Sequence, residues 1–476
     1  MTLLEQAPAP TEREATSRIR GLADKVRHGS YFRSQGRVAR VTGLVVESDG
    51  PLSAIGDVCR IDSERTGSST LAEVVGFRGE RLLLMPLGQI SGIHPGSKVT
   101  GTGAPLRVPV GDALKGRVLT GFGEPLDDLG PIVCDHPAPI QFAPPHPMKR
   151  QRIRHPFTTG IKALDTFTPC GRGQRLGIFA GSGVGKSTLL GMIASQAEAD
   201  VNVIALIGER GREVREFLEK DLSPAGRKKT VTIVATANEP ALARLNAAFA
   251  ALTIAEHFRD QGANVMLMMD SVTRFAMAQR EIGLSIGEPP ATRGYPPSVF
   301  SLLPRLLERA GNSADGCMTG LFTVLVEGDD MNDPIGDAVR SIVDGHIVLS
   351  RELATQNHYP AIDVLNSVSR LSHDLWTPGQ TDSIARARDM MALYRKNEDL
   401  INIGGYSAGA NPELDQAIAL HPRMRDFLRQ SIGEGRLPEE TWGLLDTALG
   451  VPTAEAVKAP APTTDNILGT NDIVAP

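Results

Sequence analysis

A glycine-rich run that ends in Gly-Lys-Ser is the part of the sequence with the clearest chemical meaning. Residues 180–187 read Ala-Gly-Ser-Gly-Val-Gly-Lys-Ser. Glycines let the backbone N–H groups converge on phosphate oxygens, a lysine can reach the β- and γ-phosphates, and a serine hydroxyl at a helix start can bind Mg²⁺. The run predicts a phosphate-binding loop (P-loop) for ATP and Mg²⁺, with Ser187 also a metal ligand. The residues assigned to the nucleotide are Gly181, Ser182, Gly183, Val184, Gly185, Lys186, Ser187 and Thr188.

The sequence around this run supplies the strand and the helix that a P-loop requires. Residues 175–180 have the pattern of a buried strand and residues 186–194 that of a helix, so the loop lies at a strand-to-helix junction. The strict pattern has glycine where this chain has Ala180, a small residue that the turn can accommodate. This context disfavours the alternative, a glycine-rich turn that binds nothing.

A carboxylate at the end of a second buried strand is the other half of such a site. Residues 265–269 read Val-Met-Leu-Met-Met and are followed by Asp270. A carboxylate at the C-terminal end of a strand can hold magnesium, often through water. By itself an apolar run ending in Asp usually marks only a strand end, but downstream of a P-loop it predicts a magnesium-binding role for Asp270.

Hydrolysis also requires a group that orients or polarises the attacking water. The stretch from Val203 to Glu213 places Glu209 directly after an apolar run, which makes it the candidate for that role. Composition alone favours another interpretation, in which Glu209 and Glu213 pair with the arginines at 210, 212 and 215 in a solvated turn.

The elements that must position these residues alternate along the chain. From Gly160 onward, short apolar runs alternate with helical segments, including a long alanine-rich helix at 240–258. Alternation of this kind predicts an α/β fold with a mostly parallel sheet covered by helices on both faces. The strands are expected at 175–180, 201–207, 231–235, 265–269, 321–326 and 347–349.

Other parts of the chain have different patterns. A capping box at Thr11–Glu14 opens an amphipathic helix, for which we favour a partner-binding arm over packing against its own protein. Short β-type runs between Gly36 and Leu106 predict a small β-barrel with a structural role. The proline-rich stretch from Val108 to Pro156 is expected to be an extended lead-in rather than a packed element. The domains expected are an N-terminal helix at 1–30, a barrel at 31–106, a P-loop domain at 107–380, a helical domain at 381–450 and a disordered tail at 451–476.

Composition narrows the classes of protein to consider. The chain has 476 residues, 41% of them apolar and 22% charged, which is typical of a globular protein with several domains. The net charge of -5 does not suggest a nucleic-acid binder. Four scattered cysteines indicate neither a disulfide framework nor a zinc site. We find no signal peptide and no stretch of the roughly 18 apolar residues that a membrane span needs, so we expect a cytoplasmic protein.

Several longer motifs resemble those of the hexameric ATPases related to the rotary ATP synthases, and most closely the flagellar protein-export ATPases. The resemblance extends from about Gly36 to Leu449. The motifs are the P-loop, Gly208-Glu-Arg-Gly-Arg-Glu-Val214, Met269-Asp-Ser-Val-Thr-Arg-Phe275, the segment from Gly287 to Pro297, and Asp344-Gly-His-Ile-Val-Leu-Ser350.

This resemblance implies roles that the residues alone do not. Glu209 would be the catalytic glutamate and Arg210 its neighbour near the γ-phosphate. Arg370, otherwise an ordinary polar residue at a strand end, falls where the family places an arginine that enters the active site of the adjacent subunit. Tyr359 matches an aromatic position that stacks on adenine, whereas Ile432 stands near the place of a second adenine-side aromatic, which this sequence lacks. The catalytic set is therefore Lys186, Glu209, Arg210 and Arg370.

The resemblance also implies partners. The protein would act as a homohexamer, bind a peripheral stator protein through its N-terminal helix, engage export chaperones and substrates, and reach the inner membrane and its export gate through partners. Two alternatives remain: a virulence-type (injectisome) secretion ATPase and a rotary ATP synthase subunit. A hexameric RNA translocase is disfavoured by the acidic balance and by an aromatic content of only 4%, so no nucleic-acid partner is expected.

Overall fold

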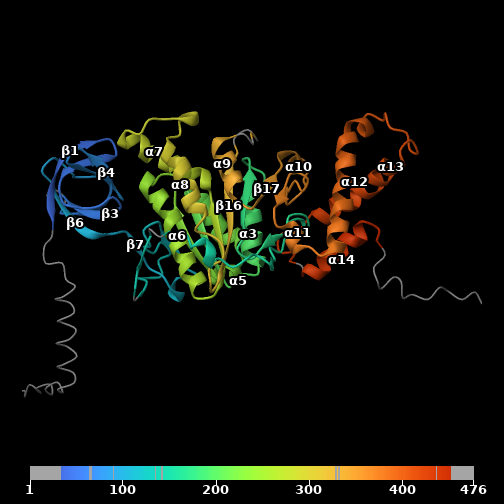
Figure 1. The fold of residues 1–476 in the computed structure, drawn as a ribbon, viewed down its shortest axis with the longest axis horizontal. Helices are drawn as coiled ribbons and strands as arrows, with labels where there is room; N and C mark the ends of the chain where they lie inside the picture. The colour runs from blue at the N-terminus through green and yellow to red at the C-terminus, as the bar shows by residue number, and fades with distance from the viewer. Residues whose placement is uncertain are drawn as a thin grey trace, which may run out of the picture. The chain divides into compact units, whose positions relative to one another are not determined.

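The computed structural model describes residues 34–451, except for 64–66, 89, 135, 141–142, 327–329, 331–332 and 436. The predicted N-terminal helix and nearly all of the predicted C-terminal tail lie outside the described residues. The chain divides into two compact units, Met1–Leu106 and Arg107–Pro476 (Figure 1). In the described part of the chain, no helix is both long enough and apolar enough to cross a membrane.

The first unit contains the predicted barrel. Its strands close in the order β1-β2-β5-β4-β3-β6. Side chains alternate between the inside and the outside of a strand, so Cys59 and Ile61 both enter the barrel core. The strands are β1 (Gln35–Thr42), β2 (Val45–Asp49), β3 (Asp57–Asp62), β4 (Ser69–Arg78), β5 (Arg81–Pro86) and β6 (Lys98–Pro105).

The second unit is built on an eight-stranded sheet in the order β18-β17-β12-β16-β15-β13-β14-β8. Every neighbouring pair is parallel except β17 and β18. The parallel sheet predicted from the alternating pattern is therefore present. Its strands are β8 (Val118–Thr120), β12 (Arg175–Ala180), β13 (Val201–Ile207), β14 (Thr230–Ala235), β15 (Asn264–Asp270), β16 (Cys317–Leu325), β17 (Gly345–Leu349) and β18 (Val368–Ser369).

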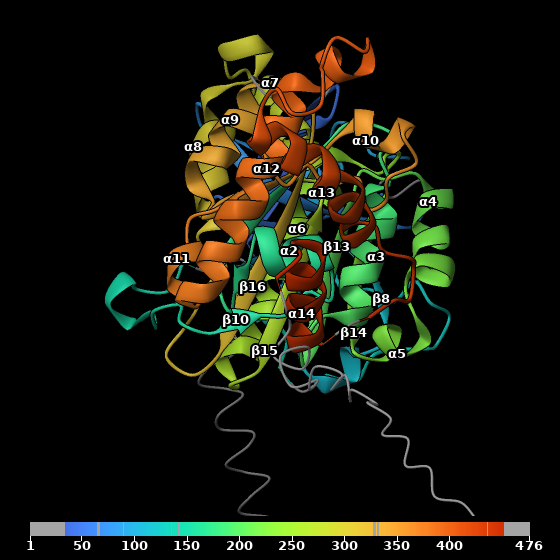
Figure 2. The same ribbon diagram turned by 90° about the vertical axis from the view of Figure 1, so that its right-hand side faces the viewer.

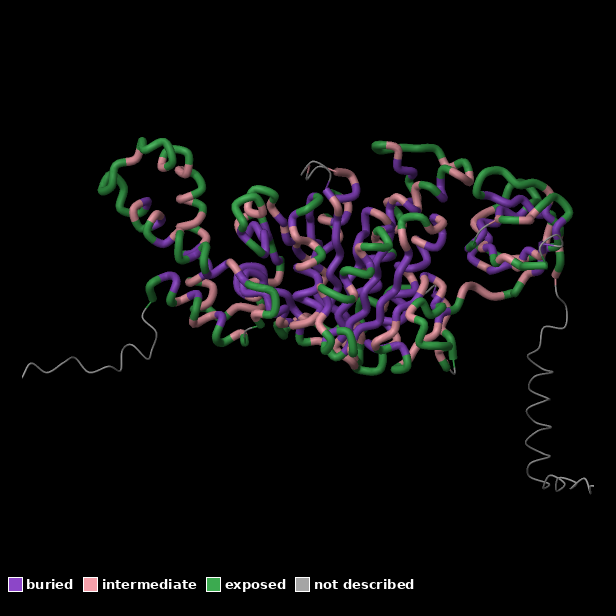
Figure 3. The backbone as a smooth tube through the Cα atoms, turned by 180° about the vertical axis from the view of Figure 1, so that it is seen from behind, coloured by how far each residue is buried: buried purple, intermediate pink, exposed green. Residues whose placement is uncertain are grey.

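Helices cover both faces of this sheet. Met266 and Met268 of β15 belong to one core cluster with the apolar side chains of α3, whereas α6 packs against β13, β14 and β15, and α7 and α9 against β16. Buried residues fill the interior between these layers (Figure 3). The helices are α2 (Lys162–Phe167), α3 (Lys186–Gln196), α4 (Gly211–Glu216), α5 (Pro224–Lys228), α6 (Ala241–Asp260), α7 (Val272–Ile286), α8 (Pro297–Leu307), α9 (Pro334–Ile342), α10 (Arg351–Thr355) and α11 (Ser372–Leu375).

Three further helices follow the sheet and belong to the same unit. They are α12 (Pro378–Asn402), α13 (Pro412–Leu428) and α14 (Pro438–Ala448). α12 packs on α13, and α13 and α14 both contact α2 (Figure 2). Met424 and Phe427 of α13 are buried in the same core cluster as α3, so these helices share a hydrophobic core with one face of the sheet.

The expectation of an unpacked lead-in between Val108 and Pro156 is wrong in part. Val118–Thr120 forms β8, which extends the sheet by pairing in parallel with β14, and Leu119 and Ile140 are buried. Three residues are too few to show the alternation that identifies a strand. The prolines lie outside β8, where they interrupt no hydrogen bond of this strand.

Candidate active site

The P-loop joins the end of β12 to the start of α3. Gly183 and Gly185 have φ angles of +79° and +84°, a left-handed conformation that residues with a Cβ adopt at a cost. Gly185 is also the residue that precedes α3. The curl of the loop therefore depends on glycine at these two positions, and it leaves the first N–H groups of an 11-residue helix without helical partners.

Lys186 lies between two carboxylates. Its Nζ donates to Asp270 Oδ1 at 2.5 Å and to Glu209 Oε1 at 3.4 Å. Burial lowers the pKa of Lys186, but the facing carboxylates outweigh burial and hold this pKa above its usual value. The lysine is therefore a fixed positive charge at the mouth of the loop, and phosphate oxygens can replace its present partners.

Glu209 reaches Lys186 because β13 ends two residues before it and Gly208 turns the chain with a φ of +69°. A Cβ on Gly208 would lie 2.9 Å from the Arg274 side chain, so this turn also needs glycine. Burial raises the pKa of Glu209, the Lys186 charge opposes that rise, and the charges of Asp270 and Glu213 add to it. A carboxylate with a raised pKa is better suited to hydrogen-bond or accept a proton from water.

The solvated charged turn exists, but its arginines pair with other carboxylates, and the ion pair of Glu209 is with Lys186. The Glu213 carboxylate pairs with Arg210 at 3.5 Å and with Arg212 at 3.4 Å, and Arg215 pairs with Glu219 at 2.8 Å. The Arg210 side chain is 72% exposed, whereas that of Glu209 is 17% exposed. The structure thus brings Lys186, Glu209 and Asp270 together and leaves Arg210 outside this group.

Asp270 ends β15 and is almost fully buried. Thr323 Oγ1 donates to Asp270 Oδ1 at 2.6 Å, the same oxygen that accepts from Lys186. The other carboxylate oxygen of Asp270, Oδ2, therefore accepts from neither of these two donors. Ser187 is exposed on the first turn of α3. A hydroxyl and a carboxylate oxygen are ligands that suit Mg²⁺.

The oxygens of Ser187 and Asp270 suit a metal ion that binds together with the substrate phosphates. Within the described ranges, no group of three or more His, Cys, Asp or Glu side chains could hold a metal ion. Mg²⁺ is usually held by one or two protein oxygens together with substrate phosphates and water. Ser187 and Asp270 fit that mode of binding.

A cavity of about 740 Å³ lies beside the P-loop. One wall is the loop with Leu189 and Met192 of α3, another is the segment 357–360, and the third is the segment 429–434. The Tyr359 ring packs on the loop, since a Cβ on Gly185 would lie 3.3 Å from its Cε1, and Ile432 lines the same cavity. We did not identify Gln430 and Glu434 from the sequence, because their position here depends on the packing of α13.

Arg370 lies at the other end of the sheet. It follows β18, and its N–H donates to the Asp344 carbonyl at 2.9 Å. Asp344 in turn pairs with Arg175, the first residue of β12. The P-loop begins at the opposite end of β12, after Ala180, which is about 17 Å away at about 3.3 Å per residue. Arg370 therefore does not reach the P-loop of its own chain.

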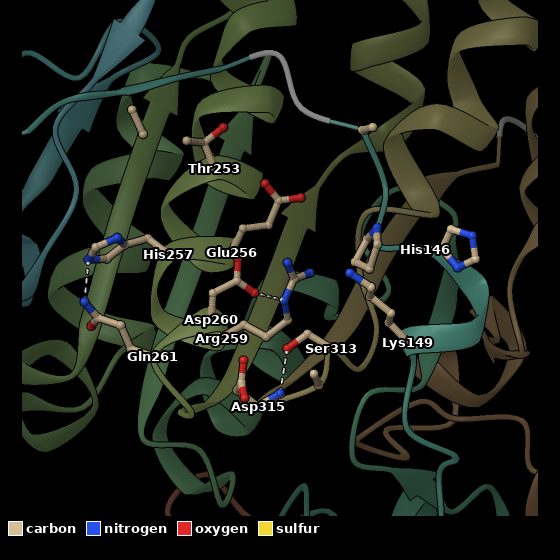
Figure 4. Close-up of a pocket in the computed structure, with 14 residues that line it drawn as sticks. His146, Lys149, Thr253, Glu256, His257, Arg259, Asp260, Gln261, Ser313 and Asp315 are labelled. Atoms are coloured by element: carbon tan, nitrogen blue, oxygen red, sulfur yellow. Dashed lines mark hydrogen bonds and ion pairs between the residues drawn. The ribbon is translucent and has the colours of Figure 1, made fainter.

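A second cavity, of about 590 Å³, contains none of these residues (Figure 4). It is lined by the end of α6 and by residues 313–315 and 143–149. Glu256 lines this cavity, but its carboxylate is already held by two hydrogen bonds from buried Arg309. We assign no chemistry to this cavity.

Models of known protein families match three segments that together span most of the chain. Residues 160–369 match the nucleotide-binding domain of the ATP synthase alpha/beta family, residues 38–103 match the beta-barrel domain of that family, and residues 376–447 match the T3SS EscN ATPase C-terminal domain.

Individual relatives match over nearly their whole length. The flagellum-specific ATP synthase of Bacillus subtilis (strain 168) is 52% identical over 91% of this chain and 99% of its own. The type 3 secretion system ATPase of Xanthomonas euvesicatoria is 48% identical over 87% and 93%. The solved structure of the assembled ATPase EscN, from the type III secretion system of enteropathogenic E. coli, has 46% identity and a TM-score of 0.83 over 87% of this chain and 100% of that chain.

Proposed function

Because this chain belongs to the flagellar and type III secretion ATPases of the ATP synthase alpha/beta family, we propose that it hydrolyses ATP in a homohexameric ring that energises the export of flagellar proteins. The Lys186, Glu209 and Asp270 cluster beside the P-loop is the observation that carries the ATPase function. A nucleotide-binding subunit without catalysis has no use for a carboxylate held at this position.

Each residue has a role that follows from its surroundings. Lys186 donates to the β- and γ-phosphates and neutralises their charge. Glu209, with its raised pKa, accepts a hydrogen bond from the attacking water and aligns it. Ser187 and Asp270 would hold Mg²⁺, which when bound would supply positive charge to offset the charge developing on the phosphates. Arg210, exposed beside Glu209, comes close to the γ-phosphate once nucleotide is bound.

The position of Arg370 supports a ring with shared sites. Its side chain is exposed at the edge of the sheet and lies too far from its own P-loop to act there. Arg370 enters the active site of the neighbouring subunit, where a guanidinium stabilises the transition state by about 10³- to 10⁵-fold in rate in other enzymes. The solved relative EscN is an assembled ATPase.

The flagellar assignment rests on the flagellar names of several relatives and on the P-loop sequence at 181–187, which resembles that of the flagellar members more than that of the injectisome members. Relatives with flagellar names and with type 3 secretion names are both about half identical, so an injectisome ATPase is the second candidate. The proposed partners are a peripheral stator protein bound by residues 1–30, export chaperones and substrates, and, through these partners, the export gate at the inner membrane. EscN has been solved in complex with its central stalk EscO.

The test is the ATPase rate per subunit against protein concentration for wild type and Arg370→Ala, with the mass measured in parallel. We expect the wild-type rate to rise as hexamers form, and Arg370→Ala to form hexamers without that rise. Full activity in Arg370→Ala would rule out the role in the adjacent subunit. No ATPase under any condition would favour a structural subunit of a rotary machine.

The flagellar assignment requires a separate experiment. Deleting the gene in its own bacterium should stop release of flagellar filament proteins into the medium. Normal filaments together with loss of injectisome secretion would favour the second candidate.

A further inference from the structure

The outer wall of the cavity beside the P-loop belongs to the segment that follows α13, not to the sheet. Residues 429–434, here called the base-side segment, line the cavity opposite the P-loop and next to Tyr359. An exposed segment without regular structure offers a ligand no fixed surface unless something holds it. Gln430, which is 6% exposed, is its most buried described residue.

Gln430 uses all of its side-chain amide groups to hold this segment. Its Oε1 accepts from the Lys162 N–H at 2.8 Å, and its Nε2 donates to the Gly160 carbonyl at 2.7 Å and to the Glu434 carbonyl. Its own N–H donates to the Tyr359 carbonyl at 3.0 Å. One residue therefore connects the start of α2, the base-side segment and the backbone of the tyrosine that packs on the P-loop.

An ion pair and a further hydrogen bond hold the same segment in place. Lys162 Nζ pairs with Glu434 Oε1 at 3.3 Å, and the other oxygen of Glu434 accepts from the Ser431 N–H at 3.1 Å. The Lys162 ammonium also lies 5.9 Å from the centre of the Phe427 ring. Because Gln430 and Glu434 are engaged within the protein, the cavity presents a ligand mainly with the faces of Tyr359, Ile432 and Leu189.

We infer that Gln430 is a positioning residue that holds Tyr359 and the base-side segment at the distance from the P-loop that a purine ring requires. This inference rests on the proposed function, because it takes the cavity as the place of the base. Gln430 acts through Tyr359 and the segment and does not itself contact the base. The hydrogen bonds of its side-chain amide fix the base-side segment before nucleotide arrives. Binding therefore has to order less of the protein.

The test compares two probes on one variant, MgADP and magnesium pyrophosphate. Gln430→Leu keeps the size of the side chain and removes all three hydrogen bonds of its side-chain amide. We expect MgADP affinity to fall about tenfold and pyrophosphate affinity to change by less than about twofold, because pyrophosphate contacts only the P-loop. Titration calorimetry measures both affinities.

Gln174 provides a matched control. It is fully buried at the start of β12, and its amide holds the Gly171 N–H, the Asp344 carbonyl and the Ser369 hydroxyl. Gln174→Leu makes the same chemical change far from the cavity and should leave the ratio of the two affinities unchanged. An equal loss for both probes in Gln430→Leu, no loss for either, or the same change of ratio in Gln174→Leu would overturn the inference.

Glu434→Gln tests the same segment if Gln430→Leu does not fold. It keeps an oxygen acceptor for Ser431 but removes the ion pair with Lys162, and we expect MgADP affinity to fall about threefold at constant pyrophosphate affinity. Unchanged MgADP affinity would overturn the inference. Neither measurement needs hydrolysis, so a wild type that binds nucleotide but lacks ATPase activity contradicts the proposed function and still allows the role of Gln430 to be decided.

Discussion

Lys186 is the residue on which the charge balance of the site depends. Its ammonium is the positive group between Asp270 and Glu209, both of which are largely buried. When phosphates bind, they add negative charge beside the same two carboxylates. The lysine ammonium and the positive N-terminal end of α3 both offset that added charge.

Lys186→Ala should therefore abolish nucleotide binding as well as turnover. Removing the ammonium leaves two carboxylates facing incoming phosphates without a counter-charge, and we expect at least about a 10²-fold loss of MgATP affinity. Equilibrium binding of a fluorescent nucleotide measures this loss. Lys149→Ala, which changes a lysine at the second cavity, is the control; normal turnover in Lys186→Ala would contradict the assignment.

Glu209→Gln separates binding from chemistry. The amide keeps the shape of the side chain but cannot accept a proton from water, so MgATP should bind normally while hydrolysis falls by about 10²- to 10⁴-fold. Single-turnover hydrolysis and binding measured on the same preparation test this. Glu219→Gln, which alters an exposed carboxylate paired with Arg215, should change the rate by less than about threefold; equal effects of the two variants would show that Glu209 has no special role.

At the scale of elements, the segment 357–360 follows α10, lines the cavity beside the P-loop and includes a buried histidine. Burial lowers the pKa of His358, the nearby charges of Arg429, Arg425 and His421 lower it further, and the result is a pKa of about 4. The folded protein therefore holds His358 neutral next to Tyr359.

The lowered pKa of His358 predicts a loss of stability in acid. Above its ordinary pKa of 6.5, the histidine is neutral in both the folded and the unfolded state. As the pH falls from about 6.5 to 4, the unfolded chain binds a proton that the folded protein does not, and this favours unfolding. The unfolding midpoint of His358→Gln should fall less than that of wild type between pH 7 and 4.5. Parallel pH profiles would show that His358 does not contribute.

The sequence predicted long elements better than short ones. The strand at Arg175–Ala180 was predicted with both of its ends, because its residues 176–180 carry no polar side chain and are followed at once by the P-loop. β8 was missed, because three residues show no period and the sheet partner, β14, lies more than a hundred positions away. Packing against a distant strand, not local preference, makes Val118–Thr120 a strand.

For the whole molecule, the proposed role of Arg370 has a consequence for how the subunits meet, because Arg370 lies away from its own P-loop. If Arg370 acts in the neighbouring subunit, as proposed, each loop of the ring faces the arginine edge of one neighbour, and the contact joins two different surfaces. Each active site would then contain Lys186 from one chain and Arg370 from the next.

This geometry predicts that two inactive variants can restore activity when mixed. In rings assembled at random from equal amounts of Lys186→Ala and Arg370→Ala chains, about one interface in four pairs an intact loop with an intact arginine. We expect up to about a quarter of the wild-type ATPase rate after co-assembly. Rings of each variant alone are the controls, and a mixture no more active than they are would contradict shared sites.

The sequence by itself determined the P-loop, the strand that ends in Asp270 and the α/β class, because each is encoded by neighbouring residues whose spacing follows one strand or one helix. Only the tertiary structure decided that Glu209 faces Lys186 rather than the arginines beside it, and that Arg370 lies at the opposite end of the sheet. It also decided that residues 429–434 form a wall of the cavity beside the P-loop. These relations join residues from 23 to about 270 positions apart, and sheet order and helix packing set such distances, which no local pattern contains.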